Sequence, residues 1–246
     1  MAIEMSRDYP LRTRDFDRNR RIKPSSILDL FQEIAQVQAD SMDIGSDDMA
    51  AQGVFWAVVR QKFEVLGQPH MGEAVTARTW PYTSSRFAFQ RDYQLRDAAG
   101  GLLVKATSEW VLMNREKRAF EPLAGHFDES ITFSEERNFP KKARKIRDFD
   151  AEGLTAFRTT PGESTVDLNG HVNNACYADF VTDALAVLMP KKLDAVVKTY
   201  QVDYRHEVLA GEPLSLYAIE PEPGIIRVKG ENEAGEVAFA AEIGLA

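Results

Sequence analysis

The sequence contains a single cysteine and no long hydrophobic run. Because Cys176 has no second cysteine among the 246 residues, a disulfide framework and a thiolate metal cluster are both excluded. Uncharged apolar stretches such as Ala184–Met189 are far too short to cross a bilayer. The opening residues mix acids with bases and contain no apolar signal segment. We therefore expect a cytoplasmic protein that does not bind membranes.

The sequence also has fewer basic than acidic residues. The chain has 30 Lys and Arg against 38 Asp and Glu, a formal net charge of -8. A general nucleic-acid binder needs a surplus of cations to neutralise phosphates, so that class is excluded. Two segments depart from the acidic average: Arg12–Lys23, and Arg137–Arg147, which contains six bases and no acid. Each is either solvated charged surface or a landing site for an acidic partner.

The two halves of the sequence contain an internal repeat. The hydrophobic fraction of 44% is ordinary for a globular protein, and this length allows one large domain or two of about 120 residues. Asp17-Arg-Asn19 recurs as Asp167-Leu-Asn169, and the same spacing places Ile22 on Val172. Further matches follow in the same order at a shorter spacing. We interpret the chain as two copies of one domain, the second copy being shorter.

Each copy predicts one long helix followed by antiparallel strands. In Pro24–Met42 and Asn173–Leu188, apolar residues recur every three or four positions, which is typical of amphipathic helices. Segments rich in Val, Phe, Tyr and Thr predict strands at Val54–Leu66, Ala74–Tyr82, Arg86–Asp97 and Leu102–Asn114. The fold class is therefore α+β, with a curved sheet around each helix.

The predicted boundaries give two domains and a connector. We expect an N-terminal domain over residues 1–135, a basic linker over 136–160 and a C-terminal domain over 161–246. The linker is inferred from a polar, basic stretch that begins near Phe133 and contains Pro140.

The densest group of polar residues is Asp-Leu-Asn-Gly-His-Val-Asn-Asn at 167–174. Asp167, Asn169 and His171 alternate, so an extended backbone would point all three to one face. Gly170 would permit close approach of backbone or ligand. The helix N-terminus behind them would stabilise a developing oxyanion. A histidine, a carboxylate and an amide at such a place fit hydrolysis of an activated acyl group.

Helix capping is the alternative role for these acids and amides. We expect Asn173 and Asn174 to act as caps, whereas the three alternating residues are expected to function together, because a cap uses only one side chain. The first copy has Arg21 where the second has His171, so it lacks the residue best suited to proton transfer near neutral pH. One catalytic half and one structural or substrate-binding half are therefore expected.

Other polar residues give weaker signals. His206 and Glu207 would point to opposite faces of a regular strand, so at most one faces a pocket, and either is equally well an exposed polar residue. Cys176 lies in an apolar helical stripe and is interpreted as a small buried residue rather than a nucleophile. The sequence has no glycine-rich phosphate loop and no metal-ligand spacing.

The segment Asp167–Tyr177 reads Asp-x-Asn-x-His-Val-Asn-Asn-x-x-Tyr and resembles the active-site segment of the acyl-ACP (acyl carrier protein) thioesterases, a tandem hotdog-fold family. Leu11–Asp17 and Ile22–Leu28 resemble the family's opening strand and first helix. Its successive strands resemble Phe55–Arg60, Thr79–Pro81, Phe89–Asp92 and Trp110–Asn114. The His-Val-Asn-Asn motif also occurs in other hotdog thioesterases, but its combination with the Thr-Trp-Pro and Arg-Asp strands is specific.

This resemblance implies a double hotdog and hydrolysis of fatty acyl thioesters of acyl carrier protein, without metal or nucleotide cofactor. It implies that Asp167, Asn169, His171 and Glu207 form the catalytic set. Plant members carry a cysteine directly after that glutamate, where this chain has Val208. Water activated by a carboxylate is therefore favoured over a cysteine nucleophile, with direct attack by Asp167 as the alternative.

For substrate binding, we expect the thioester carbonyl to lie near Asn174 and the acyl chain to enter an apolar tunnel lined by Phe31 and Trp56. Further tunnel residues would be Ile34, Val54 and Phe87. An acidic carrier protein would dock on Arg12–Lys23 or on Lys141–Arg147.

The main alternative is a hotdog thioesterase acting on acyl-CoA. A MaoC-type hydratase usually has an Asp and a His at a different spacing, which this sequence lacks, and a non-catalytic acyl-binding protein is disfavoured because the His171 group is retained in one copy. Fusion of two hotdogs already supplies the pairing that single hotdogs obtain by dimerising, so the oligomeric state is a monomer or a homodimer.

Overall fold

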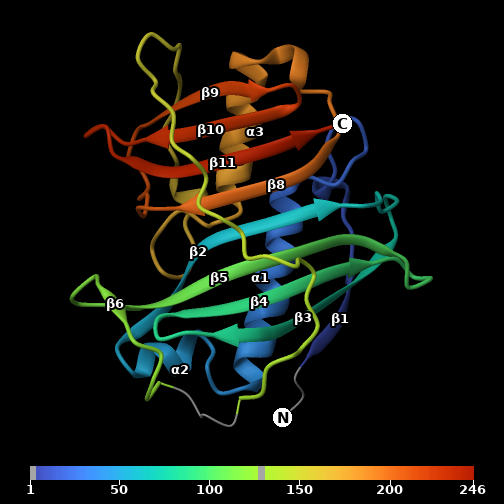
Figure 1. Cartoon of the computed structure of the whole chain (residues 1–246), viewed down its shortest axis with the longest axis vertical. Coiled ribbons are helices and arrows are strands. Elements are labelled where there is room, and N and C mark those ends of the chain that lie inside the picture. The colour runs from blue at the N-terminus through green and yellow to red at the C-terminus, as the bar shows by residue number, and fades with distance from the viewer. Residues whose placement is uncertain (1–3, 127–130) are drawn as a thin grey trace. The chain divides into compact units, whose positions relative to one another are not determined.

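The computed structural model describes residues 4–126 and 131–246, which divide into two compact units (Figure 1). The first unit comprises Met1–Ile22 and Asp29–Ala143, and the second comprises Lys23–Leu28 and Arg144–Ala246. Residues 1–3 and 127–130, which fall within the predicted N-terminal domain, lie outside the described residues. No helix of the described ranges is long and apolar enough to cross a membrane.

The long helix of the first copy, α1 (Pro24–Ser41), confirms the predicted helix to within one residue of its end. Pro24 occupies its first position, where a missing N–H costs nothing. The apolar stripe is buried, with Phe31 1% and Ile34 0% exposed. The ring of Phe31 lies 4.8 Å from that of Tyr93, so this stripe packs on the sheet.

The first unit's sheet is antiparallel, in the order β1 (Met5–Pro10), β3 (Ala74–Ser84), β4 (Ala88–Arg96), β5 (Leu102–Asn114) and β2 (Val54–Val65). A short strand, β6 (Phe120–Glu121), pairs with β5. The predicted strands correspond to β2 through β5. The opening strand was expected within Leu11–Asp17 but lies earlier, at β1, and Thr13–Asp15 forms a 3-10 turn instead. The short helix α2 (Ser46–Ala51) was not predicted.

The second unit repeats the plan with a second helix, α3 (Cys176–Leu188), and a second antiparallel sheet. Its strand order is β8 (Val197–Tyr204), β11 (Val237–Leu245), β10 (Ile225–Glu231), β9 (Leu214–Glu222) and β7 (Phe157–Thr159). The rings of Tyr177 and Phe239 meet edge to face at 5.0 Å, which packs α3 against β11. The helix begins later than the predicted Asn173, because residues 173–175 form a turn.

The segment expected as a linker is bound to the first unit's sheet. Asn138 donates from its amide side chain to the main-chain oxygens of Tyr93 (2.7 Å) and Ala106 (2.8 Å), and from its main-chain N–H to Asp92 Oδ2 (2.6 Å). Phe139 lies 5.4 Å from the Lys62 ammonium. The segment covers polar side chains that would otherwise be buried without partners. Its far end also includes β7, so the second sheet begins before residue 161.

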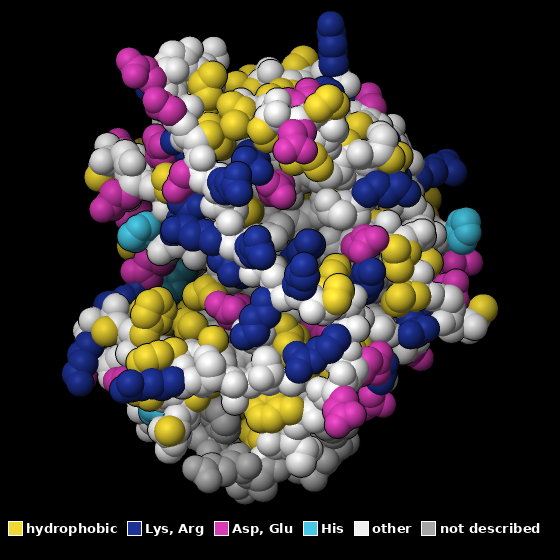
Figure 2. All heavy atoms as spheres, viewed as in Figure 1, with side chains coloured by type: hydrophobic (Ala, Val, Ile, Leu, Met, Phe, Trp, Pro, Cys, Tyr) yellow, Lys and Arg dark blue, Asp and Glu magenta, His cyan; other side chains and the backbone are white. Residues whose placement is uncertain are grey.

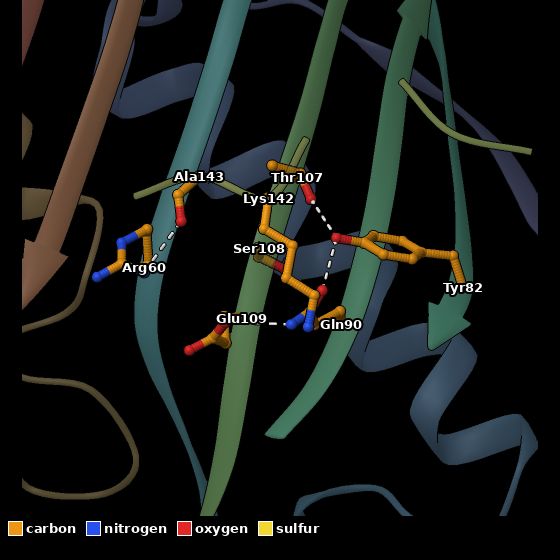
Figure 3. A pocket seen from close by; sticks show the side chains of 8 residues that line it. All are labelled: Arg60, Tyr82, Gln90, Thr107, Ser108, Glu109, Lys142 and Ala143. Carbon is orange, nitrogen blue, oxygen red and sulfur yellow. Dashed lines mark hydrogen bonds between the residues drawn. The ribbon is translucent and has the colours of Figure 1, made fainter. Parts of the chain in front are cut away.

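A small polar pocket opens where this connector crosses the first unit's sheet (Figure 3). Arg60 donates to the main-chain oxygen of Ala143 at 3.2 Å, which holds the connector at the edge of the pocket. Inside it, the Tyr82 hydroxyl and Glu109 both bond to Gln90, at 2.8 and 3.2 Å. These side chains satisfy one another, so the pocket is the underside of the connector rather than a preformed ligand site.

Candidate active site

The polar segment at 167–174 forms a tight loop, not an extended strand. Val166 and Val172 form an antiparallel bridge, and within the loop the Asp167 N–H donates to the His171 oxygen at 2.8 Å. Gly170 has φ +82, and a Cβ built there would meet nothing within 4 Å. The glycine therefore serves the turn conformation. No other part of the described chain approaches it closely, and the expectation of three side chains aligned by strand alternation is wrong.

The carboxylate of Asp167 holds this loop closed. Its Oδ1 accepts the main-chain N–H of Asn169 at 2.8 Å and that of His171 at 3.4 Å. This is an Asx turn, in which a short carboxylate replaces a main-chain acceptor. The Asn169 side chain lies at the exposed tip of the loop.

The first copy contains the same loop with the same hydrogen bonds. Asp17 Oδ1 accepts the N–H groups of Asn19 at 2.7 Å and Arg21 at 2.8 Å, and Phe16 pairs with Ile22 as the bridge. This copy has no histidine in its loop. The loop-closing role of the aspartate is therefore independent of any proton transfer.

In the second unit, the side chains of His171 and Glu207 contact each other. The Nε2 of His171 lies 2.7 Å from Oε2 of Glu207, with the side chains 16% and 44% exposed. β8 ends at Tyr204, so Glu207 and the exposed His206 lie in a loop and strand alternation does not govern them. Val172 N–H donates to the Val208 oxygen at 2.9 Å, which joins the two loops directly beside the contact.

Two tyrosines support these loops, a role that was not predicted from the sequence. The buried hydroxyl of Tyr177 hydrogen-bonds with the main chain of Val208, and burial raises the pKa of Tyr177. The Tyr204 hydroxyl donates to the main-chain oxygen of Asn174 at 2.9 Å. The rings of Tyr177 and Tyr204 meet edge to face at 5.2 Å. The sequence signal for this role was Tyr177, a tyrosine within the apolar stripe of the second predicted helix, because a buried tyrosine hydroxyl needs a polar partner.

The turn before α3 is held by Asn173. Its Oδ1 accepts the Ala175 N–H at 2.9 Å, and its main-chain oxygen accepts the Cys176 N–H at 2.9 Å. Asn173 therefore holds the turn before the helix, and the expectation that it caps the helix is wrong, because the N-cap is Ala175 and no side chain among the described residues caps this helix. Asn174, the other expected cap, is half-buried, and its main-chain oxygen receives the Tyr204 hydroxyl.

Comparison with known proteins bears directly on this geometry. The family model for the acyl-ACP thioesterase N-terminal domain matches residues 3–131, and that for the C-terminal domain matches residues 156–243. The chain belongs to the acyl-ACP thioesterase family. The Asx-turn loop, His171 and Glu207 all lie within the part matched by the C-terminal model.

Individual relatives agree with the family assignment. An oleoyl-acyl carrier protein thioesterase of Coriandrum sativum is 24% identical over 244 residues, covering 91% of this chain and 65% of the relative. The chain thus spans a little under two thirds of that relative, and 61% of a similar thioesterase from Arabidopsis thaliana.

Solved structures confirm the double hotdog fold. An acyl-ACP thioesterase from Bacteroides thetaiotaomicron superposes with a TM-score of 0.86 at 19% identity, covering 99% of this chain and 98% of the other. The 12:0-ACP thioesterase from Umbellularia californica gives a TM-score of 0.82 at 18% identity, covering 100% and 98%.

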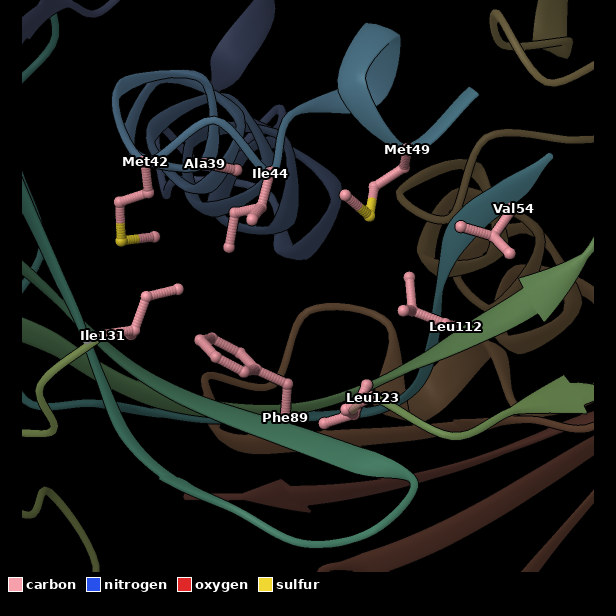
Figure 4. Close-up of a cluster of buried hydrophobic side chains, with 9 residues drawn as sticks. All are labelled: Ala39, Met42, Ile44, Met49, Val54, Phe89, Leu112, Leu123 and Ile131. Carbon is pink, nitrogen blue, oxygen red and sulfur yellow. The ribbon is translucent and has the colours of Figure 1, made fainter. Parts of the chain in front are cut away.

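A cluster of buried hydrophobic side chains lies in the first unit (Figure 4). Buried side chains from the end of α1 and the turn after it, from α2, from the sheet and from the loop that follows β6 point toward one another: Ala39, Met42, Ile44, Met49, Val54, Phe89, Leu112, Leu123 and Ile131. Trp56 packs against this cluster and donates from its indole nitrogen to the Ile44 oxygen at 2.8 Å.

Phe31, Ile34 and Phe87, which were also expected to line the tunnel, are not members of this cluster. Phe31 is fully buried against Tyr93, and Ile34 is 0% exposed. Phe87 is 39% exposed, so the structure does not bring it into the interior. The two methionines of the cluster were missed, although flexible methionine is well suited to shaping an adaptable apolar site.

Cys176 is half-buried, and its sulfur lies 3.9 Å from the Thr165 oxygen. Within the described ranges, no group of three or more His, Cys, Asp or Glu residues is arranged to hold a metal ion.

Proposed function

We propose that this protein hydrolyses fatty acyl thioesters of acyl carrier protein, releasing free fatty acid and the holo-carrier protein. The observation that carries the proposal is the 2.7 Å contact of His171 Nε2 with Glu207 Oε2, held in a family loop at the start of a helix. A carboxylate hydrogen-bonded to an imidazole is a suitable general base for activating water. The cytoplasm remains the compartment predicted from the sequence.

In the proposed mechanism, Glu207 accepts a proton from water, which attacks the thioester carbonyl carbon. A carbon–oxygen bond forms, and the carbonyl becomes an oxyanion near Asn174, where the positive end of α3 stabilises it. Collapse of the tetrahedral intermediate breaks the carbon–sulfur bond. His171 relays the proton to the departing thiolate, which leaves as the carrier's thiol.

We assign Asp167 and Asn169 supporting roles in this scheme. Asp167 fixes the loop and the main chain of His171, and the same bonds around Asp17 in the copy without histidine support this role over direct attack. Asn169, at the exposed tip, would orient the carbonyl or the attacking water.

For the acyl chain, we propose the apolar interior beside Trp56 in the first unit. Met42 and Met49, which belong to that cluster, would adapt to the chain by rotamer changes. Phe31 would form part of the wall behind it.

The decisive experiment measures thiol release from a panel of acyl-carrier and acyl-CoA substrates and compares kcat/KM. We expect turnover of acyl-carrier substrates with the higher kcat/KM. A higher kcat/KM for acyl-CoA would reassign the donor, and absence of turnover with every thioester by folded protein would overturn the hydrolase assignment. Binding of acyl-carrier protein without turnover would indicate an acyl-binding protein.

A further inference from the structure

The connector from Arg144 onward is anchored to β8 of the second unit. The main-chain N–H of Ile146 donates to Asp203 Oδ2 at 2.7 Å, and Gln201 Nε2 donates to the main-chain oxygen of Arg144 at 2.6 Å. Asp203 is 2% exposed and Gln201 9%. Both anchors lie on β8, so the backbone around Ile146 is fixed by groups that are themselves held inside the unit.

A second anchor lies one step further along. Arg205 Nη1 contacts both carboxylate oxygens of Asp148 at 2.8 Å, and its Nη2 donates to the Ile146 oxygen at 3.3 Å. Arg205 follows the last residue of β8 and precedes Glu207 by two positions. The connector is therefore tied to the same stretch of chain that leads to the proposed general base.

The side chains of this fixed backbone present cations to solvent. Arg144, Lys145 and Arg147 are exposed, whereas Ile146 between them is 5% exposed. Among the described residues, none pairs with these three cations. Four other cations of the unit each have a carboxylate partner: Lys192 with Glu220, Arg205 with Asp148, Arg227 with Glu242, and Lys229 with Glu231.

The other basic segment is less suitable. Arg12–Lys23 contains Asp15 and Asp17 among its bases. Arg21 Nε lies 3.7 Å from Asp17 Oδ2, so part of this positive charge is already neutralised. Figure 2 shows Lys and Arg side chains gathered on the face viewed in Figure 1, over which the connector runs.

We propose that Arg144, Lys145 and Arg147 form a docking surface for an acidic protein, the carrier that delivers the acyl thioester. This inference rests on the proposed function. Unpaired cations on a fixed backbone attract an acidic partner by long-range electrostatics, at little cost in backbone ordering. Nucleic acid is not the partner that fits, because a net charge of -8 opposes phosphate binding.

The test is a charge reversal in the full chain, R144E/K145E/R147E, with binding of a bacterial holo-acyl carrier protein as the readout. We expect Kd to rise about tenfold or more at low salt, as rim charges govern encounter. The Kd of the unaltered protein should rise with salt, whereas that of the variant should depend on salt much less. The neutral variant R144Q/K145Q/R147Q should show an intermediate Kd and serves as the second variant if the reversal fails to fold.

The matched control is R158E/K191E/K198E, which reverses three other exposed cations of the same unit that have no ion-pair partner among the described residues. These cations lie on β7, in the turn after α3 and on β8, outside the proposed docking surface, so the same change in net charge should alter Kd less than twofold. Equal weakening by both triple variants, or no weakening by the connector variant, would overturn the docking surface.

Kinetics separates this proposal from the proposed function. The connector variant should raise KM for acyl-carrier substrates and leave kcat, and turnover of a small acyl thioester without a carrier, unchanged. Hydrolysis with an unchanged KM and Kd would reject the docking surface alone. Failure of the unaltered protein to hydrolyse any thioester would reject the hydrolase, while the binding measurement would still decide the docking surface.

Discussion

The Nε2 of His171 lies 2.7 Å from Oε2 of Glu207, although the two residues belong to loops on either side of α3 and β8 in the chain. The hydrogen bond from Val172 to the Val208 oxygen and the buried Tyr177 hydroxyl hold the loops together. This pair is accessible to solvent through the glutamate, which is 44% exposed. An imidazole and a carboxylate in this relation can share a proton and activate water.

Removing either member of the pair should abolish most of the activity. Glu207→Gln and His171→Ala should each lower kcat by about 100-fold or more, because each removes a step of proton transfer. His206→Ala is the matched control, since this neighbouring histidine is exposed and should keep the rate within about twofold. Steady-state thiol release measures all three, and a folded Glu207→Gln protein with full kcat would remove the glutamate from the mechanism.

The two loop aspartates allow the structural and chemical roles of Asp167 to be separated. Asp167→Ala and Asp17→Ala should each lower the free energy of unfolding by about 1 kcal/mol, because each removes an acceptor shared by two N–H groups. Only Asp167→Ala should also lower kcat. Denaturant unfolding and thiol release are the measurements.

Asp167→Asn provides the sharper test of the same assignment. An asparagine retains the Oδ1 acceptor, so the loop and a large part of the activity should survive. A loss of about 100-fold in kcat with unchanged unfolding would instead give this carboxylate a direct role in the chemistry.

The buried carboxylate of Asp92 should make stability depend on pH. Burial raises the pKa of Asp92 from its ordinary value of 3.8 to about 6, against the lowering effects of the Asn138 N–H, Thr107 and Arg137. Because the folded state binds the proton more tightly than the unfolded state, this group's contribution favours folding at low pH. It is lost as pH rises through about 6.

Asp92→Asn should remove that dependence. The shift corresponds to a loss of about 2.5 kcal/mol in the free energy of unfolding between pH 4 and pH 7.5. Urea unfolding of both proteins at several pH values isolates this contribution as a difference, which removes the effect of other titrating groups. Parallel pH profiles for the two proteins would contradict the assignment.

The ion pair of Arg205 with Asp148 should protect the connector from proteolysis. Asp148 is 54% exposed at its side chain, so Asp148→Ala should change the free energy of unfolding by less than about 1 kcal/mol. It should nevertheless speed tryptic cleavage at Arg144 and Arg147 severalfold, because the local backbone opens more often. Asp150→Ala removes a nearby exposed carboxylate and should leave cleavage unchanged. Peptide mass analysis of timed digests gives the rates.

Local patterns in the sequence were sufficient for α1 and for β2 through β5. The three- and four-residue spacing predicted α1 to within one residue, and the segments rich in Val, Phe, Tyr and Thr predicted the four strands, because apolar spacing and strand propensity are local signals. The repeat of Asp17-x-Asn19 at Asp167-x-Asn169 extended to identical hydrogen bonds in both loops.

The same local reasoning failed where turn chemistry overrode it. Alternation around Asp167 suggested a strand, but the Asx turn and the left-handed Gly170 fold the segment back on itself. The start of α3 was misplaced for a related reason, since Asn173 uses its side chain to hold a turn.

Sequence alone thus determined the two copies, their helices and the family motif, because periodicity and short-range hydrogen bonding are local properties. The family resemblance already placed Glu207 beside His171 in the catalytic set, but only the tertiary structure showed their direct contact and the binding of the basic connector to β8. Those contacts join residues distant in the chain, and their geometry depends on the packing of α3 against its sheet through Tyr177. The spacing of residues along the sequence does not by itself specify that packing.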